Sequence, residues 1–119
     1  MNMTAVGNLE VLLSVDGSSP YSTCSSTGAP VNTGQWTLAG YTYDAAAQTV
    51  VIYRNGVAVK TCTAGSNSVP ASIFVNAMAF QVGTSDTSAS GNSYVGSIDD
   101  VRAYKRVLTA NEAKALYDQ

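Results

Sequence analysis

The sequence lacks histidine and is poor in charge. None of its 119 residues is histidine, and Asp, Glu, Lys and Arg make up 12% of the chain, against about 25% in an average globular protein. Histidine is the commonest general base and transition-metal ligand, and it is the base of most nucleophilic triads. Only carboxylates remain for catalysis, and no nucleophile has a base beside it. We therefore expect that the protein is not an enzyme.

The chain also lacks basic clusters and long apolar runs. Its six basic and eight acidic residues leave a net charge of -2 with no Lys/Arg run, so it offers little for the counterion release on which nucleic-acid binding depends. Residues 9–15 contain Glu10 and follow no basic region, unlike a signal peptide or a membrane span. We expect no nucleic-acid partner and no membrane insertion. If the protein acts outside a cell, another segment, another export route or a virion carries it there.

Cysteine is scarce, with Cys24 and Cys62 as the two examples. They can form one disulfide or stay as small buried thiols, and the sequence alone does not decide between these states.

Alternating apolar residues predict short strands. Residues 9–15 alternate and end at Asp16-Gly17, as in a strand that buries one face. Residues 18–34 are rich in Ser, Thr, Gly and Pro and predict a loop, with room for one short strand at 21–25. Trp36 opens the next strand, which runs to Tyr43, and we interpret this tryptophan as a packing residue.

A β-hairpin is the clearest local signal. Residues 49–54 and 57–62 flank Asn55-Gly56, a pair that favours a two-residue type I′ turn because both positions tolerate positive φ. Regular pairing places Ile52 opposite Val59 and Val50 opposite Thr61, and we predict that this side faces the core.

The C-terminal third predicts two more strands and a helix. Met78, Phe80 and Val82 alternate with smaller residues, and residues 94–104 predict the last strand. Thr109 and Glu112 form a capping box, which indicates a short helix with an apolar stripe of Ala113, Leu116 and Tyr117. With no repeat or linker, residues 1–119 predict one all-β domain, an antiparallel β-sandwich with a short C-terminal helix.

Three segments, in this order, resemble the laminin-G-like, concanavalin A-like family that includes the pentraxins. This resemblance covers residues 31–119 and implies a jelly roll. The segments are Gly34-Gln35-Trp36 running to Tyr41-Thr42-Tyr43-Asp44, Ile52-Tyr53-Arg54-Asn55-Gly56, and Tyr94-Val95-Gly96-Ser97-Ile98-Asp99-Asp100-Val101-Arg102-Ala103-Tyr104 with Leu108, Thr109 and Glu112.

The sequence departs from the family at its front, where members carry further strands. A sandwich without them leaves strand edges exposed, and such edges pair with other chains. We therefore expect either a homo-oligomer, a partner chain or upstream segment that supplies the strands, or a fold that closes over a smaller core.

The resemblance also implies candidate sites. In related modules an aspartate at the position of Asp99 helps to hold a structural calcium ion, whereas the alternative for Asp99 is a hydrogen bond that fixes the chain. Asp99 and Asp100 on one strand would point to opposite faces, which disfavours the paired carboxylates of glycoside hydrolysis. Tyr41, Tyr43 and Tyr53 are candidate ligand-binding residues, because rings on an outer sheet face can stack on sugars.

Two functions therefore remain open. The family resemblance implies a non-catalytic carbohydrate-binding or adhesion module that recognises surface glycans. The alternative is a structural protein, such as a phage virion decoration or appendage subunit, that oligomerises through its sandwich. Both imply an extracellular, cell-surface or virion location, with a glycan or a surface or virion protein as partner.

Overall fold

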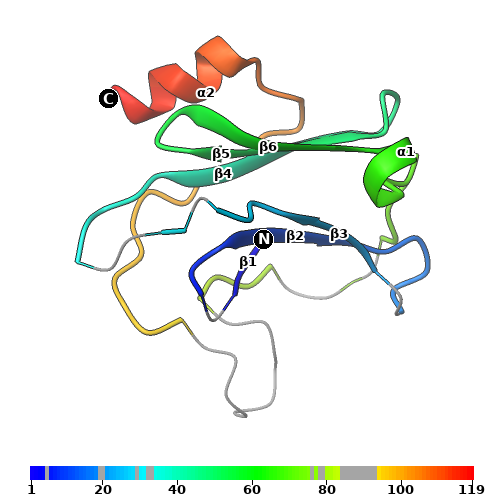
Figure 1. Cartoon of the computed structure of the whole chain (residues 1–119), viewed down its shortest axis with the longest axis horizontal. Coiled ribbons are helices and arrows are strands. Elements are labelled where there is room, and N and C mark those ends of the chain that lie inside the picture. The colour runs from blue at the N-terminus through cyan, green and yellow to red at the C-terminus, as the bar shows by residue number, and fades with distance from the viewer. Residues whose placement is uncertain are drawn as a thin grey trace.

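The protein is a two-layered β-sandwich with one helix on its outer side (Figure 1). The computed structural model describes residues 1–4, 6–18, 21–28, 30–31, 34–75, 77, 80–83 and 94–119. Each layer is a three-stranded antiparallel sheet, and strands that neighbour one another in sequence pair within each sheet. The all-β class, the antiparallel sheets and the short C-terminal helix agree with the prediction.

The first sheet has the order β1 (Asn2–Met3), β2 (Leu9–Leu13), β3 (Ser22–Ser25). The predicted strand at 9–15 is therefore confirmed as far as Leu13, and the short strand at 21–25 is confirmed as β3. The turn after β2 forms because the Ser14 hydroxyl accepts the Gly17 N–H at 2.9 Å and Asp16 Oδ1 accepts the Ser18 N–H at 2.8 Å. This ends the strand before Val15.

The second sheet has the order β4 (Ala39–Asp44), β5 (Thr49–Arg54), β6 (Val57–Thr63), and a single helical turn, α1 (Ala64–Asn67), follows β6. The Asn55-Gly56 hairpin is confirmed, with φ of 51° and 74° at its two central residues. Because one residue of β6 is taken up by a bulge beside Ile52, the pairing beyond the bulge differs from the expected one.

The bulge corrects two predicted pairs. Ile52 lies opposite Lys60 instead of Val59, and Val50 lies opposite Cys62 instead of Thr61. The predicted core face of β5 is nevertheless right, because Val50 and Ile52 are fully buried.

The core lies between the two sheets. The first sheet contributes apolar residues from β2 and β3, the second contributes residues from β5 and β6, and the segment after α1 adds one valine. The buried residues of this cluster are Leu9, Val11, Leu13, Cys24, Val50, Ile52, Cys62 and Val69. Burial of this apolar surface is the main force that holds the two sheets together.

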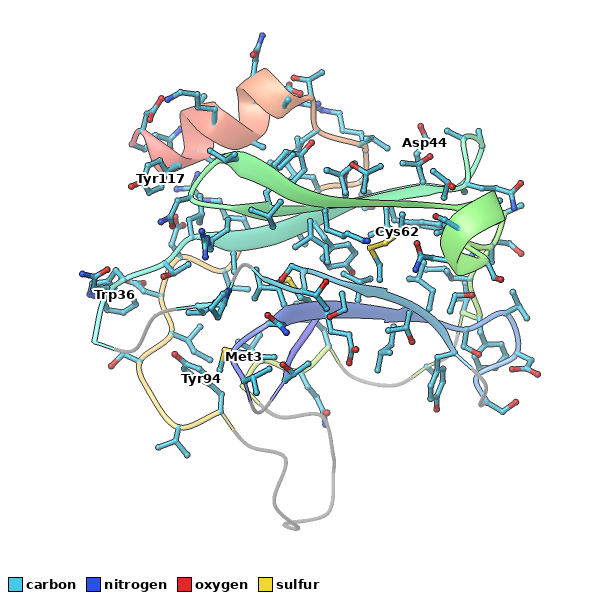
Figure 2. The ribbon with its side chains drawn as sticks, in the orientation of Figure 1. Met3, Trp36, Asp44, Cys62, Tyr94 and Tyr117 are labelled. Carbon is cyan, nitrogen blue, oxygen red and sulfur yellow. A yellow bond between two sulfur atoms is a disulfide. The ribbon has the colours of Figure 1, made fainter. Side chains whose placement is uncertain are left out.

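A disulfide joins the two sheets through this core. Cys24 of β3 and Cys62 of β6 are bonded, with a Cα–Cα distance of 5.9 Å (Figure 2). The structure thereby decides the question that the sequence left open. Nearby, the buried Ser26 hydroxyl accepts the Leu9 N–H at 2.9 Å, so this polar group is also satisfied inside the core.

The C-terminal strands are not found. Residues 94–104 form no strand, and every residue from 94 to 107 is exposed. Residues 80–83 likewise form no strand, while Met78 lies outside the described residues. A strand requires a hydrogen-bonded neighbour, and no described strand pairs with residues 94–104. The left-handed backbone of Asp100, with φ of 54°, further interrupts an extended conformation there.

The predicted helix is confirmed as α2 (Ala110–Tyr117). The Thr109 hydroxyl accepts the Glu112 N–H at 3.3 Å, and the Glu112 carboxylate accepts the Thr109 N–H at 2.8 Å, which is the predicted capping box. The helix lies on the side of the second sheet that faces away from the first (Figure 1), over the β5–β6 hairpin.

Candidate functional site

The three candidate tyrosines do not share one surface. Tyr41 and Tyr43 lie opposite Ile52 and Val50, so their side chains belong to the core side of the sheet. Tyr43 packs against the core cluster, and its hydroxyl donates to the Pro70 carbonyl at 2.8 Å. Burial, with a smaller effect of the neighbouring Asp44 charge, raises the pKa of Tyr43.

Tyr53 lies on the other side of the sheet and is only 8% exposed. The structure therefore places Tyr43 and Tyr53 in packing positions on opposite faces of the sheet, contrary to the expectation of a common outer face. Tyr41 is the most accessible of the three, at the edge of the core side.

Trp36 corrects another expectation, because it is not a packing residue. Its side chain is 71% exposed, and it lies in the loop before β4 at the same end of the molecule as Tyr117 (Figure 2). The strand begins at Ala39, three residues after Trp36. A tryptophan that stays exposed contributes little of its large apolar surface to the stability of the fold. Its exposure therefore indicates a role in binding.

A surface groove of about 270 Å³ is built around Trp36. Three separate segments line it: the loop before β4, the segment 99–100 and the last turn of α2. Tyr117 is the second aromatic ring and is 49% exposed. The lining residues are Trp36, Thr37, Leu38, Asp99, Asp100, Leu116 and Tyr117.

Two contacts of the β5–β6 hairpin turn position the segments that line the groove. Asn55 accepts the Leu38 N–H through its side chain at 3.0 Å and donates its own N–H to the Leu38 carbonyl at 2.8 Å, which fixes the loop to the hairpin turn. On the other side, Gly56 lies directly under α2. A Cβ added to Gly56 would stand 2.9 Å from the Lys114 Cα and 3.1 Å from the Tyr117 Cβ.

The polar side of the groove consists of two adjacent carboxylates. Asp99 Oδ1 accepts the Asp100 N–H at 2.8 Å, and Asp100 Oδ1 forms an ion pair with Arg102 Nε at 2.7 Å. The hydrogen bond that Arg102 donates to Asp100 raises the pKa of Arg102. Because residues 94–104 form no strand, Asp99 and Asp100 line the same groove, and the expected separation onto two strand faces is wrong.

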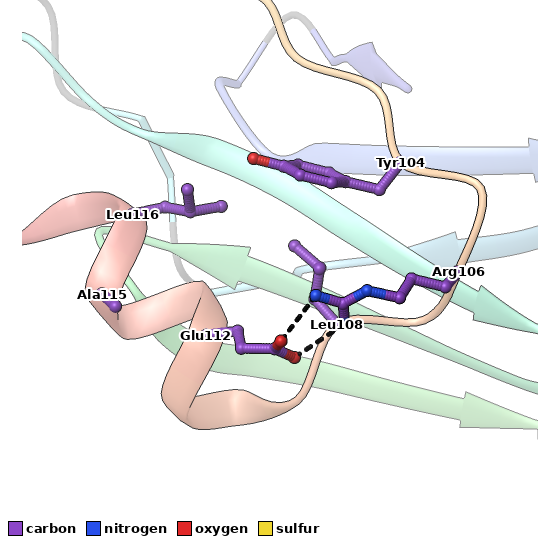
Figure 3. A pocket seen from close by; sticks show the side chains of 6 residues that line it. All are labelled: Tyr104, Arg106, Leu108, Glu112, Ala115 and Leu116. Carbon is purple, nitrogen blue, oxygen red and sulfur yellow. Dashed lines mark hydrogen bonds and ion pairs between the residues drawn. The ribbon is translucent and has the colours of Figure 1, made fainter.

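A second hollow, of about 210 Å³, lies between residues 104–108 and α2 (Figure 3). Arg106 forms a two-pronged ion pair with Glu112 there, at 2.6 and 3.0 Å. Hydrogen bonds from Arg106 and Thr109 lower the pKa of Glu112 to about 2. Arg106 and Glu112 pair with each other, and we call this ion pair the clasp of α2. Because the two charged groups are paired, they offer few free hydrogen-bonding groups to a ligand in this hollow.

Metal ligation has little support from side chains. Within the residues that the structure describes, no group of three or more His, Cys, Asp or Glu side chains could hold a metal ion. Calcium prefers six to eight oxygen ligands, so calcium at Asp99 stays a prediction from the family resemblance. The hydrogen bond from the Asp100 N–H is the chain-fixing contact that the alternative interpretation expected.

The sequence did not reveal the groove because its parts are far apart along the chain. The local patterns predict that Trp36 packs in the interior and that Tyr117 belongs to the apolar stripe of the helix, and neither pattern predicts that the two rings meet. One signal in the sequence could have placed Trp36 in the loop before the strand, namely the polar Gly34-Gln35 pair that precedes it.

Comparison with known proteins identifies the fold. Residues 1–114 match the family model described as the concanavalin A-like lectin/glucanases superfamily. No curated protein sequence matches the chain. Within the described residues, no helix is long and apolar enough to cross a membrane.

A solved structure also resembles the chain, an S-layer domain-containing protein (residues 221–444) from Clostridium thermocellum. The two share 22% sequence identity with a TM-score of 0.58, and the match covers 98% of this chain. It covers 66% of the other chain, so this chain spans just under two thirds of that structure.

Proposed function

Because the chain belongs to the concanavalin A-like lectin/glucanase superfamily, we propose that it is a non-catalytic carbohydrate-binding or adhesion module that recognises surface glycans. The observation that carries this proposal is the groove between Trp36 and Tyr117. Aromatic rings stack on the apolar faces of sugars, and carboxylates accept hydrogen bonds from sugar hydroxyls. Asp99 and Asp100 supply such acceptors beside the two rings.

The groove is a more suitable sugar site than the three tyrosines proposed from the sequence. Tyr53 is buried and Tyr43 donates its hydroxyl to the backbone, so Tyr41 alone retains a largely accessible ring. A binding site needs accessible groups that converge on one ligand, and the groove residues meet this requirement.

The absence of histidine and the ion pair of Asp100 support a role without catalysis. Asp100 is paired with Arg102, which leaves Asp99 as the one carboxylate of the described lining without an ion pair, whereas glycoside hydrolysis needs one carboxyl group as an acid and another as a base or nucleophile. We expect bound oligosaccharides to be recovered intact, without new reducing ends, after prolonged incubation with the protein.

The Cys24–Cys62 disulfide supports an extracellular or cell-surface location. Disulfides persist in oxidising surroundings and are rare in the cytosol. A virion surface is equally oxidising once it is released from a cell.

Trp36 permits a direct test because it is the single tryptophan of the chain. Its fluorescence should change when an oligosaccharide enters the groove, and a glycan array followed by titration of the best ligand would measure this. Trp36→Ala, which has no tryptophan and is therefore measured by isothermal titration calorimetry, should weaken binding by about 10-fold or more, as expected for loss of a central aromatic contact of about 1.5 kcal/mol.

Phe80→Ala is the matched control, because Phe80 is also a strongly exposed ring and does not line the groove. It should leave glycan affinity unchanged. Equal effects of the two variants, or an array without any binding glycan, would contradict the proposal.

A structural role is the second candidate, and the exposed residues 94–104 favour it. This segment has the composition of a strand but pairs with none of the described strands, and its exposed apolar side chains include Tyr94, Val95, Ile98, Val101 and Tyr104. Exposed apolar segments of this kind mark protein contacts. Light scattering after size-exclusion chromatography tests it: a trimer or larger assembly supports a virion or appendage subunit, whereas a stable monomer favours glycan binding.

A further inference from the structure

The charge of the Trp36 groove indicates which sugars it can take. Asp99 is exposed, and within the described part of the chain its carboxylate accepts one hydrogen bond, from the Asp100 backbone N–H to Oδ1 at 2.8 Å. Among the described residues, no Lys or Arg side chain forms an ion pair with it. The groove therefore presents one carboxylate that no cation neutralises.

The second carboxylate of the groove, Asp100, is neutralised by an arginine that also has a second partner. Arg102 pairs with Asp100 at 2.7 Å through Nε and donates from Nη1 to Gln119 Oε1 at 3.0 Å. These two contacts hold the guanidinium between Asp100 and Gln119, so Asp100 balances its charge. Lys114, which precedes Tyr117 on α2, is paired with Asp118 at 2.6 Å. The described residues that line the groove include no Lys or Arg, so the lining itself offers no cation to an anionic sugar.

The aromatic side of the groove also favours a positively charged ligand. The face of an indole ring carries negative charge density and attracts an ammonium group, and tryptophan is the best partner among the aromatic side chains. Trp36 is 71% exposed and can present a face to a ligand. The ring and the Asp99 carboxylate therefore favour positive charge independently of each other.

We propose that this groove prefers glycans with free amino groups, such as glucosamine oligomers, over neutral glycans, and that it disfavours glycans with carboxylates. The proposal rests on the glycan-binding function proposed above and specifies its ligand class. An ammonium on the sugar would pair with Asp99 beside the Trp36 ring, while the sugar ring stacks on Trp36 or Tyr117. A uronic acid at the same place would meet an unneutralised carboxylate.

Three ligands of equal length separate these classes: an oligomer of glucosamine, its N-acetylated form and an oligomer of a uronic acid. Affinities would be measured by isothermal titration calorimetry and Trp36 fluorescence at low ionic strength. We expect the glucosamine oligomer to bind about 5-fold more tightly than the N-acetylated one, the size of a favourable exposed ion pair. The uronic acid oligomer should bind most weakly, and added salt should reduce these differences.

Asp99→Asn removes the charge and keeps an oxygen that can accept the Asp100 N–H. It should bring the ratio of the glucosamine to the N-acetylated affinity close to 1 while leaving binding of the N-acetylated oligomer nearly unchanged. Asp16→Asn is the matched control: Asp16 also accepts a backbone N–H at 2.8 Å, from Ser18, but does not line the groove. The control removes the same charge from the protein and should preserve the ratio.

The outcomes distinguish the two proposals. If the N-acetylated oligomer binds and Trp36→Ala weakens it, but the glucosamine ratio is near 1 or is unaffected by Asp99→Asn, the glycan-binding function stands and the amino-sugar preference is overturned. An equal loss of the ratio in Asp16→Asn would also overturn it, since the effect would then reflect net charge. If no sugar binds at all, both proposals fall.

Discussion

The disulfide-bonded sandwich and the C-terminal residues 94–119 are stabilised in different ways. The sandwich has a buried apolar cluster and a covalent link between its sheets. The C-terminal part has one buried residue, Ala113, and is held by exposed ion pairs and by the contact of α2 with Gly56. The groove lies where the two parts meet. The shape of the groove therefore depends on the C-terminal part, which has few buried residues, whereas the fold depends on the disulfide-bonded sandwich.

The largest effect is expected in the sandwich core. Ile52 is fully buried between the sheets, so Ile52→Ala should reduce the free energy of unfolding by about 2–5 kcal/mol, through lost burial and an unfilled cavity. Chemical denaturation measures this loss. Val57→Ala, at an exposed site of the same hairpin, should change stability by less than about 0.5 kcal/mol, and a similar loss in both would contradict the assigned core.

Removal of the disulfide should have the next largest effect. Replacing both Cys24 and Cys62 by serine should lower the free energy of unfolding by about 2–4 kcal/mol, because the cross-link restricts the unfolded chain. Denaturation curves with and without reductant provide the control. The wild type should become less stable in reductant and the double variant should not respond, and a wild type that is insensitive to complete reduction would contradict this role.

A smaller effect is expected where the two regions touch. Gly56→Ala would place a Cβ 2.9 Å from the Lys114 backbone in addition to the strain of a positive φ, and should cost more than about 1 kcal/mol. Because α2 must then move, Trp36 fluorescence should also shift. Gly28→Ala isolates the strain, since Gly28 has a φ of 83° and nothing lies within 4 Å of an added Cβ.

Gly28→Ala should be less destabilising than Gly56→Ala and should leave the Trp36 emission unchanged. The contact between α2 and the hairpin would be refuted if the two variants behaved alike.

The smallest effect concerns pH. Ion pairing with Arg106 and hydrogen bonds from Thr109 lower the pKa of Glu112 from 4.5 to about 2. A carboxyl group whose pKa is lowered by folding stabilises the protein above its ordinary pKa, and this stabilisation is lost as the pH falls from about 4.5 through 2. Wild type should therefore be more stable than Glu112→Gln at neutral pH, and the difference should shrink across this range.

The pH effect should also become smaller in 1 M salt, because the ion pair is exposed to solvent. A difference between wild type and Glu112→Gln that is constant from pH 7 to pH 2 would show that the clasp has no electrostatic part.

Local patterns predicted the sandwich better than the C-terminal part. The alternation at residues 9–13, the Asn55-Gly56 turn and the Thr109–Glu112 capping box were all confirmed, because each depends on contacts between residues that are close in the sequence. The bulge beside Ile52 was missed, because local pattern gives no sign of an extra residue in one strand. The strand predicted at residues 94–104 was wrong for another reason. A strand needs a neighbouring strand to pair with, and the local pattern does not show whether one is present.

The location of the proposed groove could not be predicted from the sequence. The sequence suggested aromatic rings and an aspartate as the groups of interest, and the proposed groove has both kinds, but two of the chosen rings, Tyr43 and Tyr53, are used for packing. Strand alternation gives the face of a residue relative to its neighbours, and it does not say which face another layer covers.

The sequence by itself determined the all-β class, the hairpin, the helix cap and the family resemblance, because these follow from turn residues, alternation and short motifs within single segments. Only the tertiary structure decided that Cys24 and Cys62 are bonded, that Trp36 faces solvent and that it shares a groove with Asp99, Asp100 and Tyr117. These features join residues that are tens of positions apart, and their proximity arises only when the sheets pack and α2 settles on Gly56.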